Sequence, residues 1–377
     1  MKSAHFSILC LVGCHTATAQ APVDASVPAD FAHSSTADLT ATPVDGSGSP
    51  TDSGGGGGDG GGNYRYSQIT THTAAGHDLL YFSGFVYAVD YGTDIVYAID
   101  PTTRGLATSI AVSKSPHHLF SDDHNLYVLN VMAFDLQTDY FLSVVDPSTN
   151  TVTHSIKPKT FMQGSDPNNY PTSQGPMGGC ALNGSLYVDF PTNAIPDVLP
   201  IVVGSWSTSP LWAAGSGPAD ITAADGKLFI IQGRVIFDPD DDAIMVTQPD
   251  GTQLQMLETG GALQDIITAN GKVWASRAGQ NGMPHELLVI DPATYDIQHV
   301  TVGAGAFQMA SMNGKVYVAC TDDNSINVVD ASSLTVVAQI PLGGYEPAIT
   351  KPRGVAVSPA GDVYVESNGQ IGVLVEQ

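Results

Sequence analysis

A short motif, in which an aromatic residue follows an apolar one, recurs seven times along this chain. Each copy begins a short apolar segment, as in Phe85–Ala88 and Lys315–Val318. The aromatic residues are Tyr87, Tyr127, Tyr187, Phe229, Trp274, Tyr317 and Tyr364. Their intervals are 40, 60, 42, 45, 43 and 47 residues. Periods of this length indicate a repeat architecture, in which each copy is one supersecondary unit.

Each unit contains further strand signals. A second apolar segment follows the motif and ends at an Asp, as in Val96–Asp100 and Val144–Asp146. Asp followed by Pro favours a type I turn, and another β-rich segment such as Thr335–Ile340 comes after it. The units show no amphipathic helical period. About four short strands in roughly 40–45 residues are typical of a β-propeller blade.

Residues 64–377 divide into seven such units of about 45 residues. The last unit ends after its third strand, Ile371–Glu376, whereas Tyr66–Ile69 resembles the fourth strand of the other units. We therefore expect an all-β fold, a seven-bladed β-propeller of four-stranded blades over 64–377. The N-terminal strand would complete the last blade and close the ring without an open sheet edge.

The repeat also resembles a known family. The segment Val316–Asp330, with the Ala338–Pro341 that follows it, is similar to the YVTN family of β-propeller repeats, as in YncE-like proteins. The resemblance covers most of 64–377; it is strongest in unit six and in Ile95–Pro116, and weakest in units three and four. It implies a propeller. It leaves function open, because such propellers act as binding modules, extracellular surface proteins and, in lactonase and lyase relatives, enzymes.

The N-terminus has the features of an export signal. Residues 1–13 carry one Lys before the apolar run Phe6–Gly13, which is typical of a signal peptide. Leu11–Cys14 resembles a bacterial lipobox, in which Cys14 is lipidated and becomes the mature N-terminus. In the alternative, Ala17–Ala19 is an ordinary signal peptidase site, and cleavage after Ala19 releases a soluble secreted or periplasmic protein.

Residues 15–63 are rich in Ala, Pro, Asp, Ser and Gly, and end in Gly54–Gly58 and Gly60–Gly62. A segment with one aromatic residue and no apolar period cannot offset the entropy of ordering, so we expect a disordered tether. A tether suits a protein fixed to a membrane at one end. We therefore expect a lipid-anchored monomer at the cell envelope, on the periplasmic or surface side.

Composition excludes several partners. The chain has 37 acidic and 13 basic residues and a net charge of −24. Nucleic acids and anionic lipid surfaces are bound through clustered Lys and Arg, so neither is expected as a partner. No apolar run of about 18 residues follows the N-terminus, so a lipid anchor would be the only membrane contact. Cys180 and Cys320 are interpreted as buried, inert thiols.

A set of polar residues recurs nine places before the repeated aromatic residue. The set is Asp78, His118, Gly178, Asp220, Asp265 and Gln308, with Gly354 aligned after one extra residue in unit seven. This position begins the leading strand of each blade, and leading strands line a propeller's channel, so we expect these residues to form a ring. Carboxylates and an amide suit a divalent cation such as calcium, and an imidazole also suits transition metals.

The sequence therefore predicts a metal site of Asp78, His118, Asp220 and Asp265. In the alternative, each polar side chain binds the backbone of the next blade or water in the channel. Clustered carboxylates repel one another and have raised pKa values unless a cation compensates them, which keeps the metal hypothesis in view.

Ligand contacts are predicted for Gln308 and for His117 and Arg353, which stand with His77 one place before the ring. His117 and His118 are adjacent and would point to opposite faces of a regular strand. The acidic run Asp238–Asp242 is interpreted as a solvated loop, with cation binding as the alternative. The insertion Phe161–Gly179 predicts a long loop whose Tyr170 and Met177 either contact a ligand or pack down as decoration.

Catalytic motifs are missing from the sequence. It contains no Gly-x-Ser-x-Gly, no His-Glu-x-x-His, no phosphate-binding glycine loop and no Cys-x-x-Cys-His. This favours a non-catalytic binding or scaffold module whose partner is a protein or small molecule of the envelope. The alternative is a metal-assisted hydrolase or lyase, with the ion in the channel and one carboxylate or His118 as base. A purely structural spacer is a third hypothesis.

Overall fold

The computed structural model describes residues 64–69, 78–130, 141–157, 176–190, 197–215, 217–233, 242–279, 283–345 and 349–377. The regular structure in these ranges consists of 29 strands, and it contains no helix. Within the same ranges, no helical segment is long and apolar enough to cross a bilayer. The signal peptide, the lipobox with Cys14 and the tether of 15–63 lie outside the described residues.

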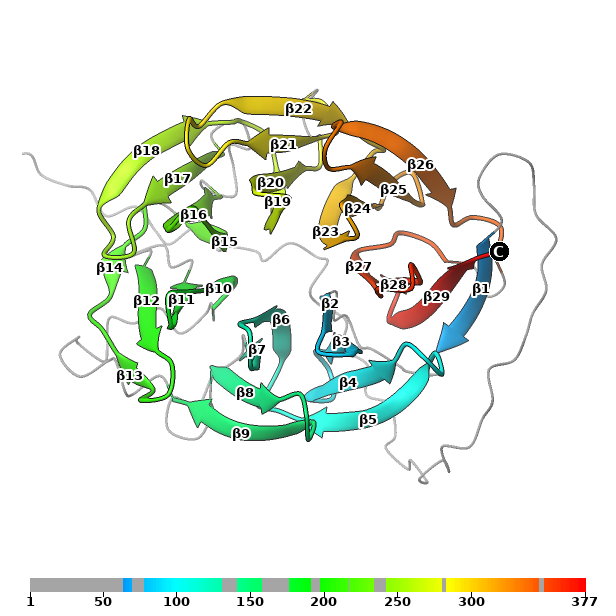
Figure 1. Cartoon of the computed structure of the whole chain (residues 1–377), viewed down its shortest axis with the longest axis horizontal. Coiled ribbons are helices and arrows are strands. Elements are labelled where there is room, and N and C mark those ends of the chain that lie inside the picture. The colour runs from blue at the N-terminus through cyan, green and yellow to red at the C-terminus, as the bar shows by residue number, and fades with distance from the viewer. Residues whose placement is uncertain are drawn as a thin grey trace, which may run out of the picture. The chain divides into compact units, whose positions relative to one another are not determined.

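Seven antiparallel sheets surround a central channel, so the expected all-β, seven-bladed propeller is confirmed (Figure 1). Blade 1 contains β2 (Leu79–Phe82), β3 (Phe85–Asp90), β4 (Ile95–Asp100) and β5 (Gly105–Ala111). Blade 2 contains β6 (Pro116–Ser121), β7 (Leu126–Asn130), β8 (Leu142–Asp146) and β9 (Thr151–Ile156). Blade 3 contains β10 (Gly179–Leu182), β11 (Ser185–Phe190), β12 (Asp197–Val202), β13 (Ser207–Thr208) and β14 (Trp212–Ala213).

The remaining blades follow the same order outward from the channel. Blade 4 contains β15 (Pro218–Ala224), β16 (Lys227–Gln232), β17 (Ala243–Thr247) and β18 (Gln253–Glu258). Blade 5 contains β19 (Leu263–Ala269), β20 (Lys272–Arg277), β21 (Glu286–Ile290) and β22 (Ile297–Thr301). Blade 6 contains β23 (Ala306–Met312), β24 (Lys315–Cys320), β25 (Ser325–Asp330) and β26 (Thr335–Pro341). Blade 7 contains β27 (Gly354–Val357), β28 (Val363–Ser367), β29 (Gln370–Glu376) and β1 (Tyr64–Ile69).

The N-terminal strand closes the ring as predicted. β1 pairs antiparallel with β29, from Tyr64 opposite Glu376 to Ile69 opposite Ile371. The Tyr66 ring lies across the backbone of Gly372, where a Cβ atom would overlap it. Blade 7 contains both ends of the described chain. The propeller can therefore open at this blade only if the hydrogen bonds between β1 and β29 break.

Local sequence explains the tight hairpins between the first two strands of a blade. The two-residue turns Asn183-Gly184, Asp225-Gly226, Asn270-Gly271 and Asn313-Gly314 have positive φ at both positions. This is the conformation of a type I′ turn, which Asn-Gly and Asp-Gly favour because it matches the twist of the flanking strands. The second strand therefore returns directly along the first, and the position of each leading strand is fixed.

The hydrophobic core lies between neighbouring blades. Trp274 in blade 5 packs in one cluster with Val316 and Val318 of blade 6. Tyr364 of blade 7 packs with Leu79 and Val86 of blade 1. The repeated aromatic residues are all buried. They therefore join adjacent blades, which explains why the motif recurs at each unit.

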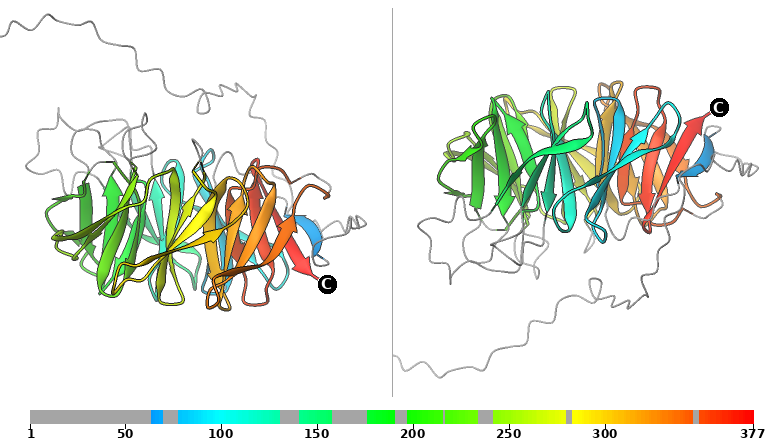
Figure 2. Two further views of the ribbon diagram at one scale, coloured as in Figure 1. Left: turned by 90° about the horizontal axis from the view of Figure 1, so that it is seen from above. Right: turned by 90° about the horizontal axis from the view of Figure 1, so that it is seen from below.

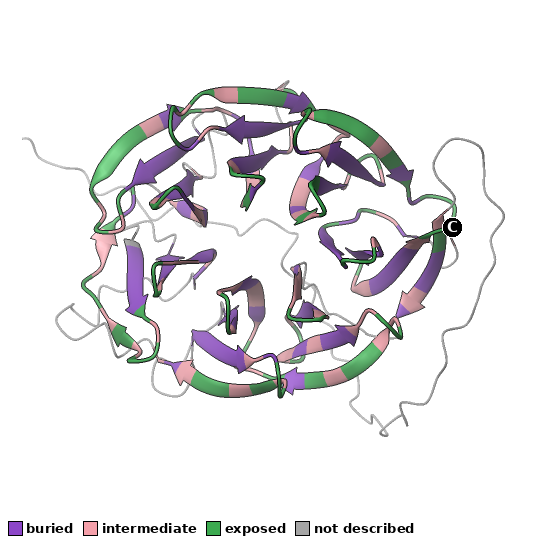
Figure 3. Ribbon diagram, in the orientation of Figure 1, coloured by how far each residue is buried: buried purple, intermediate pink, exposed green. Residues whose placement is uncertain are grey.

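The middle strands are buried and the outermost strands are half exposed (Figure 3). Figure 2 shows the strands running from one face of the propeller to the other. Blade 3 departs from the repeat, because its outer strand is broken into β13 and β14, which both pair with β12. The long interval before this blade includes residues 158–175, which lie outside the described ranges.

Candidate functional site

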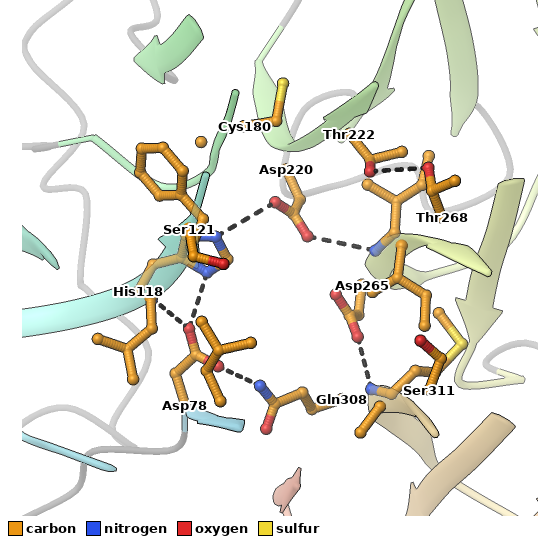
Figure 4. Close-up of a pocket in the computed structure, with 18 of the residues that line it drawn as sticks. Asp78, His118, Ser121, Cys180, Asp220, Thr222, Asp265, Thr268, Gln308 and Ser311 are labelled. Carbon is orange, nitrogen blue, oxygen red and sulfur yellow. Dashed lines mark hydrogen bonds and ion pairs between the residues drawn. The ribbon is translucent and has the colours of Figure 1, made fainter. Parts of the chain in front are cut away.

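The ring predicted from the repeat is present in the channel. The side chains of Asp78, His118, Asp220, Asp265 and Gln308 line one central cavity with a volume of about 380 Å³ (Figure 4). They come from the innermost strands of blades 1, 2, 4, 5 and 6 or the residue just before them. Gly178 and Gly354 stand at the corresponding places of blades 3 and 7 and contribute no side chain.

β-bulges in the leading strands set the direction of several of these side chains. The register of the leading strand shifts just before His118, Asp220 and Asp265, and again between Ala306 and Met309. A bulge inserts one unpaired residue and turns the next side chain. His117 is the inserted residue of blade 2, so the strict alternation assumed for a regular strand does not apply to the His117–His118 pair.

Most of the ring side chains bind the backbone of the next blade. Oδ2 of Asp78 accepts the Leu119 N–H at 2.5 Å, and Oδ2 of Asp265 accepts the Met309 N–H at 2.5 Å. Oδ2 of Asp220 accepts the Ile266 N–H at 3.2 Å. The alternative raised for the ring, hydrogen bonding between blades, is therefore present in the structure.

Gln308 extends this pattern across blade 7, whose ring position is a glycine. Its Oε1 accepts the N–H of Val355 at 2.9 Å and that of Leu79 at 3.3 Å. Its Nε2 donates to Oδ1 of Asp78 and to the Leu79 carbonyl. One amide thus joins blades 6, 7 and 1, and all of its hydrogen-bonding groups are used.

His118 supplies positive charge to the ring. Its Nδ1 lies 3.0 Å from Oδ2 of Asp78, and its Nε2 lies 4.0 Å from Oδ1 of Asp220. Burial alone would lower the pKa of His118, but Asp78, Asp220 and Asp265 together raise it to about 10. The imidazole is therefore a cation at neutral pH. The protein itself provides the compensating cation that clustered carboxylates require.

The other side of the ring is less well compensated. Burial raises the pKa of Asp220 well above its usual value, and the nearby Asp265 and Asp189 raise it further, against the lowering effect of His118. Burial also raises the pKa of Asp265 to about 6. Asp220 therefore retains a proton in conditions in which an exposed Asp would be ionised.

Asp189 on β11 is a member of this group that the sequence analysis missed. It is fully buried, and its Oδ1 accepts the N–H of Gly178 at 2.8 Å and that of Met177 at 3.3 Å. Burial raises the pKa of Asp189 to about 7. The available signal was an acidic residue inside the apolar segment of unit three, two places after Tyr187.

Gly178 makes room for the acidic side of the ring. A Cβ atom at this position would overlap Oδ1 of Asp220 and lie 3.0 Å from Oδ2 of Asp189. The glycine in the ring register of blade 3 therefore allows two carboxyl groups from neighbouring blades to approach each other.

Above the ring, the cavity wall is mixed in character. The hydroxyl groups come from Tyr81, Ser121, Thr222, Thr268 and Ser311, and the apolar groups include Leu80, Phe120, Ile267 and Met312. Oγ1 of Thr222 lies 3.2 Å from Oγ1 of Thr268, which links blades 4 and 5 at the wall. Cys180 also lines the cavity, and burial raises the pKa of its thiol well above the usual value, in agreement with an inert thiol.

The four predicted metal ligands are engaged in contacts within the protein. In the described part of the chain, no group of three or more His, Cys, Asp or Glu side chains is arranged to hold a metal ion. Asp78 is engaged by Leu119, His118 and Gln308. The predicted divalent-cation set of Asp78, His118, Asp220 and Asp265 therefore converges on one cavity, and metal binding by it stays a prediction.

Of the predicted ligand contacts, only Gln308 lines the cavity. His117 and Arg353 are not among its lining residues, and the Arg353 guanidinium lies 5.9 Å from the centre of the Phe307 ring. His77, Tyr170 and residues 238–241 of the acidic run lie outside the described ranges. Asp242, which ends that run, is buried and accepts the Leu263 N–H at 2.9 Å, which is a structural contact.

Comparisons with known proteins establish the fold alone. No family model matches the chain, and no curated protein matches it. Among solved structures, a hydrazine synthase from Kuenenia stuttgartiensis superposes with a TM-score of 0.62 at 14% identity, covering 80% of this chain and 95% of that one. A streptogramin B lyase gives 0.63 at 15% identity, covering 84% and 98%. The WD40 propeller domain of Doa1 gives 0.58 at 10% identity, covering 84% and 98%. This chain therefore shares the β-propeller fold with proteins of different functions.

Proposed function

We propose that this protein is a non-catalytic binding module of the cell envelope, and that its ligand enters the channel cavity. The observation that supports this proposal is the commitment of the ring side chains. Asp78, Asp220, Asp265 and Gln308 each accept an N–H from a neighbouring blade. A preformed cavity with fixed polar groups and a mixed wall is typical of small-molecule binding sites.

The same arrangement argues against general base catalysis by the imidazole. A general base must hold a free lone pair near the operating pH. His118 has its pKa raised to about 10 by the surrounding carboxylates, so it is protonated and holds Asp78 instead.

The proposal extends to the rest of the chain. We place the protein in the YVTN/YncE-like repeat family on the strength of the unit-six segment. We assign Cys14 as a lipidated N-terminus and 15–63 as the tether that carries a monomeric propeller away from the membrane. Replacing Cys14 with Ser should move the protein from the membrane fraction to the soluble fraction of the producing cell. Retention of fatty-acid label by that variant would contradict the anchor.

A thermal-shift screen of the full chain tests the binding function. Small polar molecules of the envelope should include compounds that raise the melting temperature and are recovered unchanged. Ser311→Phe, which fills the cavity wall, should abolish these shifts, whereas Asp296→Asn, an exposed change in the turn before β22, should leave them unchanged. Chemical conversion of a bound compound, or shifts that persist in Ser311→Phe, would overturn the proposal.

The metal-assisted hydrolase or lyase remains the second candidate, because three carboxyl groups and an imidazole line one cavity. Elemental analysis of the purified protein, with melting curves recorded with and without EDTA, separates the two. A stoichiometric metal whose removal lowers the melting temperature would favour the enzyme.

A further inference from the structure

We propose that the channel cavity binds a small organic cation with a primary or secondary ammonium group, which sits between the carboxyl groups of Asp220 and Asp265. The inference rests on the proposed binding function and names the chemical class of the ligand.

The hydrogen bonds of the ring leave acceptors on one side. The Asp78 carboxylate is filled by Leu119, His118 and Gln308. Asp265 accepts the Met309 N–H through Oδ2, and Figure 4 shows its other oxygen directed toward the carboxyl group of Asp220, to which it is hydrogen-bonded. Asp220 accepts one N–H through each oxygen, from Ile221 and from Ile266. A carboxylate accepts about four hydrogen bonds, so this pair retains acceptor positions that face the cavity.

A second observation lies behind this pair. Oδ2 of Asp189 is buried and has no hydrogen-bond partner in the described structure. This oxygen and Oδ1 of Asp220 both lie against Gly178, where a Cβ atom would overlap Asp220; Asp189 stands behind Asp220 and is not one of the residues that line the cavity. Three carboxyl groups on this side therefore face one imidazolium, whose Nε2 lies 4.0 Å from Asp220. The site lacks positive charge, and a net charge of −24 attracts cations to the molecule as a whole.

The form of the acceptors favours an ammonium over a metal ion. A calcium ion takes about six to eight oxygen ligands, and the described residues offer no group of three metal-binding side chains. An ammonium needs only two or three acceptors, and hydrogen bonds between two charged groups are about twice as strong as neutral ones. The carboxyl pair supplies these acceptors at the cavity floor.

The wall fits the organic part of such a ligand. Ser121 and Ser311 offer hydroxyl groups, and Leu80, Ile267 and Met312 offer apolar surface above the floor. A volume of about 380 Å³ holds a small molecule of one or two functional groups.

Isothermal titration calorimetry on the full chain tests the proposal with matched probes. Ethanolamine, 1,4-diaminobutane and glucosamine are compared with ethylene glycol, 1,4-butanediol and glucose, and with sodium, potassium and calcium ions. At least one ammonium probe should bind saturably and at least about tenfold more tightly than its neutral partner.

Variants then locate the site. Asp265→Asn retains an oxygen for the Met309 N–H and should weaken ammonium binding by about tenfold or more. Asp220→Asn provides a second test if the first variant folds poorly, and exposed Asp296→Asn should not alter binding. Neutral probes that bind equally well would overturn the ammonium assignment and leave the binding function intact. Binding of metal ions alone would overturn both the ammonium assignment and the proposed binding function. A failure of all these probes and of all the screened compounds to bind would also overturn both.

Discussion

The two sides of the channel ring are built from one repeat position but differ in how their charges are balanced. On the compensated side, Asp78, His118 and Gln308 bind one another and the neighbouring blades. On the acidic side, the buried carboxyl groups of Asp189 and Asp220 meet beside Gly178, and the half-buried Asp265 lies next to Asp220. The compensated side joins neighbouring blades through an ion pair and hydrogen bonds. The acidic side also joins neighbouring blades, but it contains a buried carboxyl oxygen, Oδ2 of Asp189, without a hydrogen-bond partner in the described structure.

A repeated register therefore predicts where a side chain lies but not whether it stabilises the fold. The same place in each blade carries an acid, an imidazole, an amide or no side chain at all. Which of these stabilises the propeller depends on its neighbours across the blade boundary. Loss of the cation on the compensated side and loss of an acid on the acidic side should therefore have opposite signs.

The largest effect is expected on the compensated side. Replacing His118 with Gln removes the cation that pairs with Asp78 and leaves that carboxylate buried and uncompensated. Breaking one partner of such a buried pair lowers the free energy of unfolding by about 3–5 kcal/mol. Urea denaturation of wild type and His118→Gln at neutral pH measures this loss of unfolding free energy. His299→Gln is the control, because the His299 side chain is 55% exposed and its partner Glu286 keeps a second cation in Arg277, so its loss should cost under about 1 kcal/mol.

The pH dependence of this difference has a defined sign. The folded pKa of His118 is about 10, whereas an unfolded His titrates near about 6.5. The stabilisation is therefore complete below about pH 6.5 and is lost as the pH rises toward 10. The gap in unfolding free energy between wild type and His118→Gln should shrink over this interval. A gap that widens with pH would show that His118 is neutral in the folded protein.

On the acidic side, Gly178→Ala tests the space between the carboxyl groups. The added Cβ overlaps Asp220, so the variant should lose about 1–3 kcal/mol of unfolding free energy through overpacking. Gly343→Ala, where a Cβ meets open space, should be close to neutral. Asp220→Ala should relieve part of the penalty in the double variant. Equal losses of unfolding free energy in Gly178→Ala and Gly343→Ala would show that the effect comes from the glycine backbone and not from the overlap with Asp220.

Much of the architecture was accessible from the sequence, because it depends on patterns that repeat. The spacing of Tyr87 to Tyr364 predicted seven blades, and the missing strand of the last unit predicted that the N-terminal strand would complete it. Register alignment also brought Asp78, His118, Asp220, Asp265 and Gln308 to one cavity.

The rest depends on contacts that occur only once. Asp189 has no counterpart in a repeated position of known role, so alignment could not place it beside Asp220. The charge of His118 follows from a 3.0 Å approach to Asp78 across a blade boundary, which no spacing rule contains. The bulges that aim the ring are local changes of register, and they also moved His117 out of the alternation expected for it.

We expect Asp220→Asn to raise the free energy of unfolding, whereas His118→Gln and Gly178→Ala lower it, and the change should be smaller. The pKa of Asp220 is raised by burial, so the carboxyl group destabilises the fold as the pH rises above its unfolded value of about 3.9. The amide retains an oxygen for the Ile266 N–H and carries no charge. The variant should therefore unfold at a higher urea concentration than wild type at pH 8. The gain should vanish near pH 4, and destabilisation at both pH values would refute it.

The smallest effect concerns the wall above the acidic side. The hydroxyls of Thr222 and Thr268 lie 3.2 Å apart, and Thr268 also donates to the Ala223 carbonyl at 2.9 Å, so blades 4 and 5 have a second link beyond the Asp220–Ile266 bond. Thr222→Val should cost about 0.5–1 kcal/mol of unfolding free energy, the usual net value of one hydrogen bond. Combined with Asp220→Asn, the gain and the loss of unfolding free energy should add, because the amide retains its own bond to blade 5. A double variant that is much less stable than this sum predicts would mean that the Asp220–Ile266 bond and the Thr222–Thr268 bond form one cooperative contact.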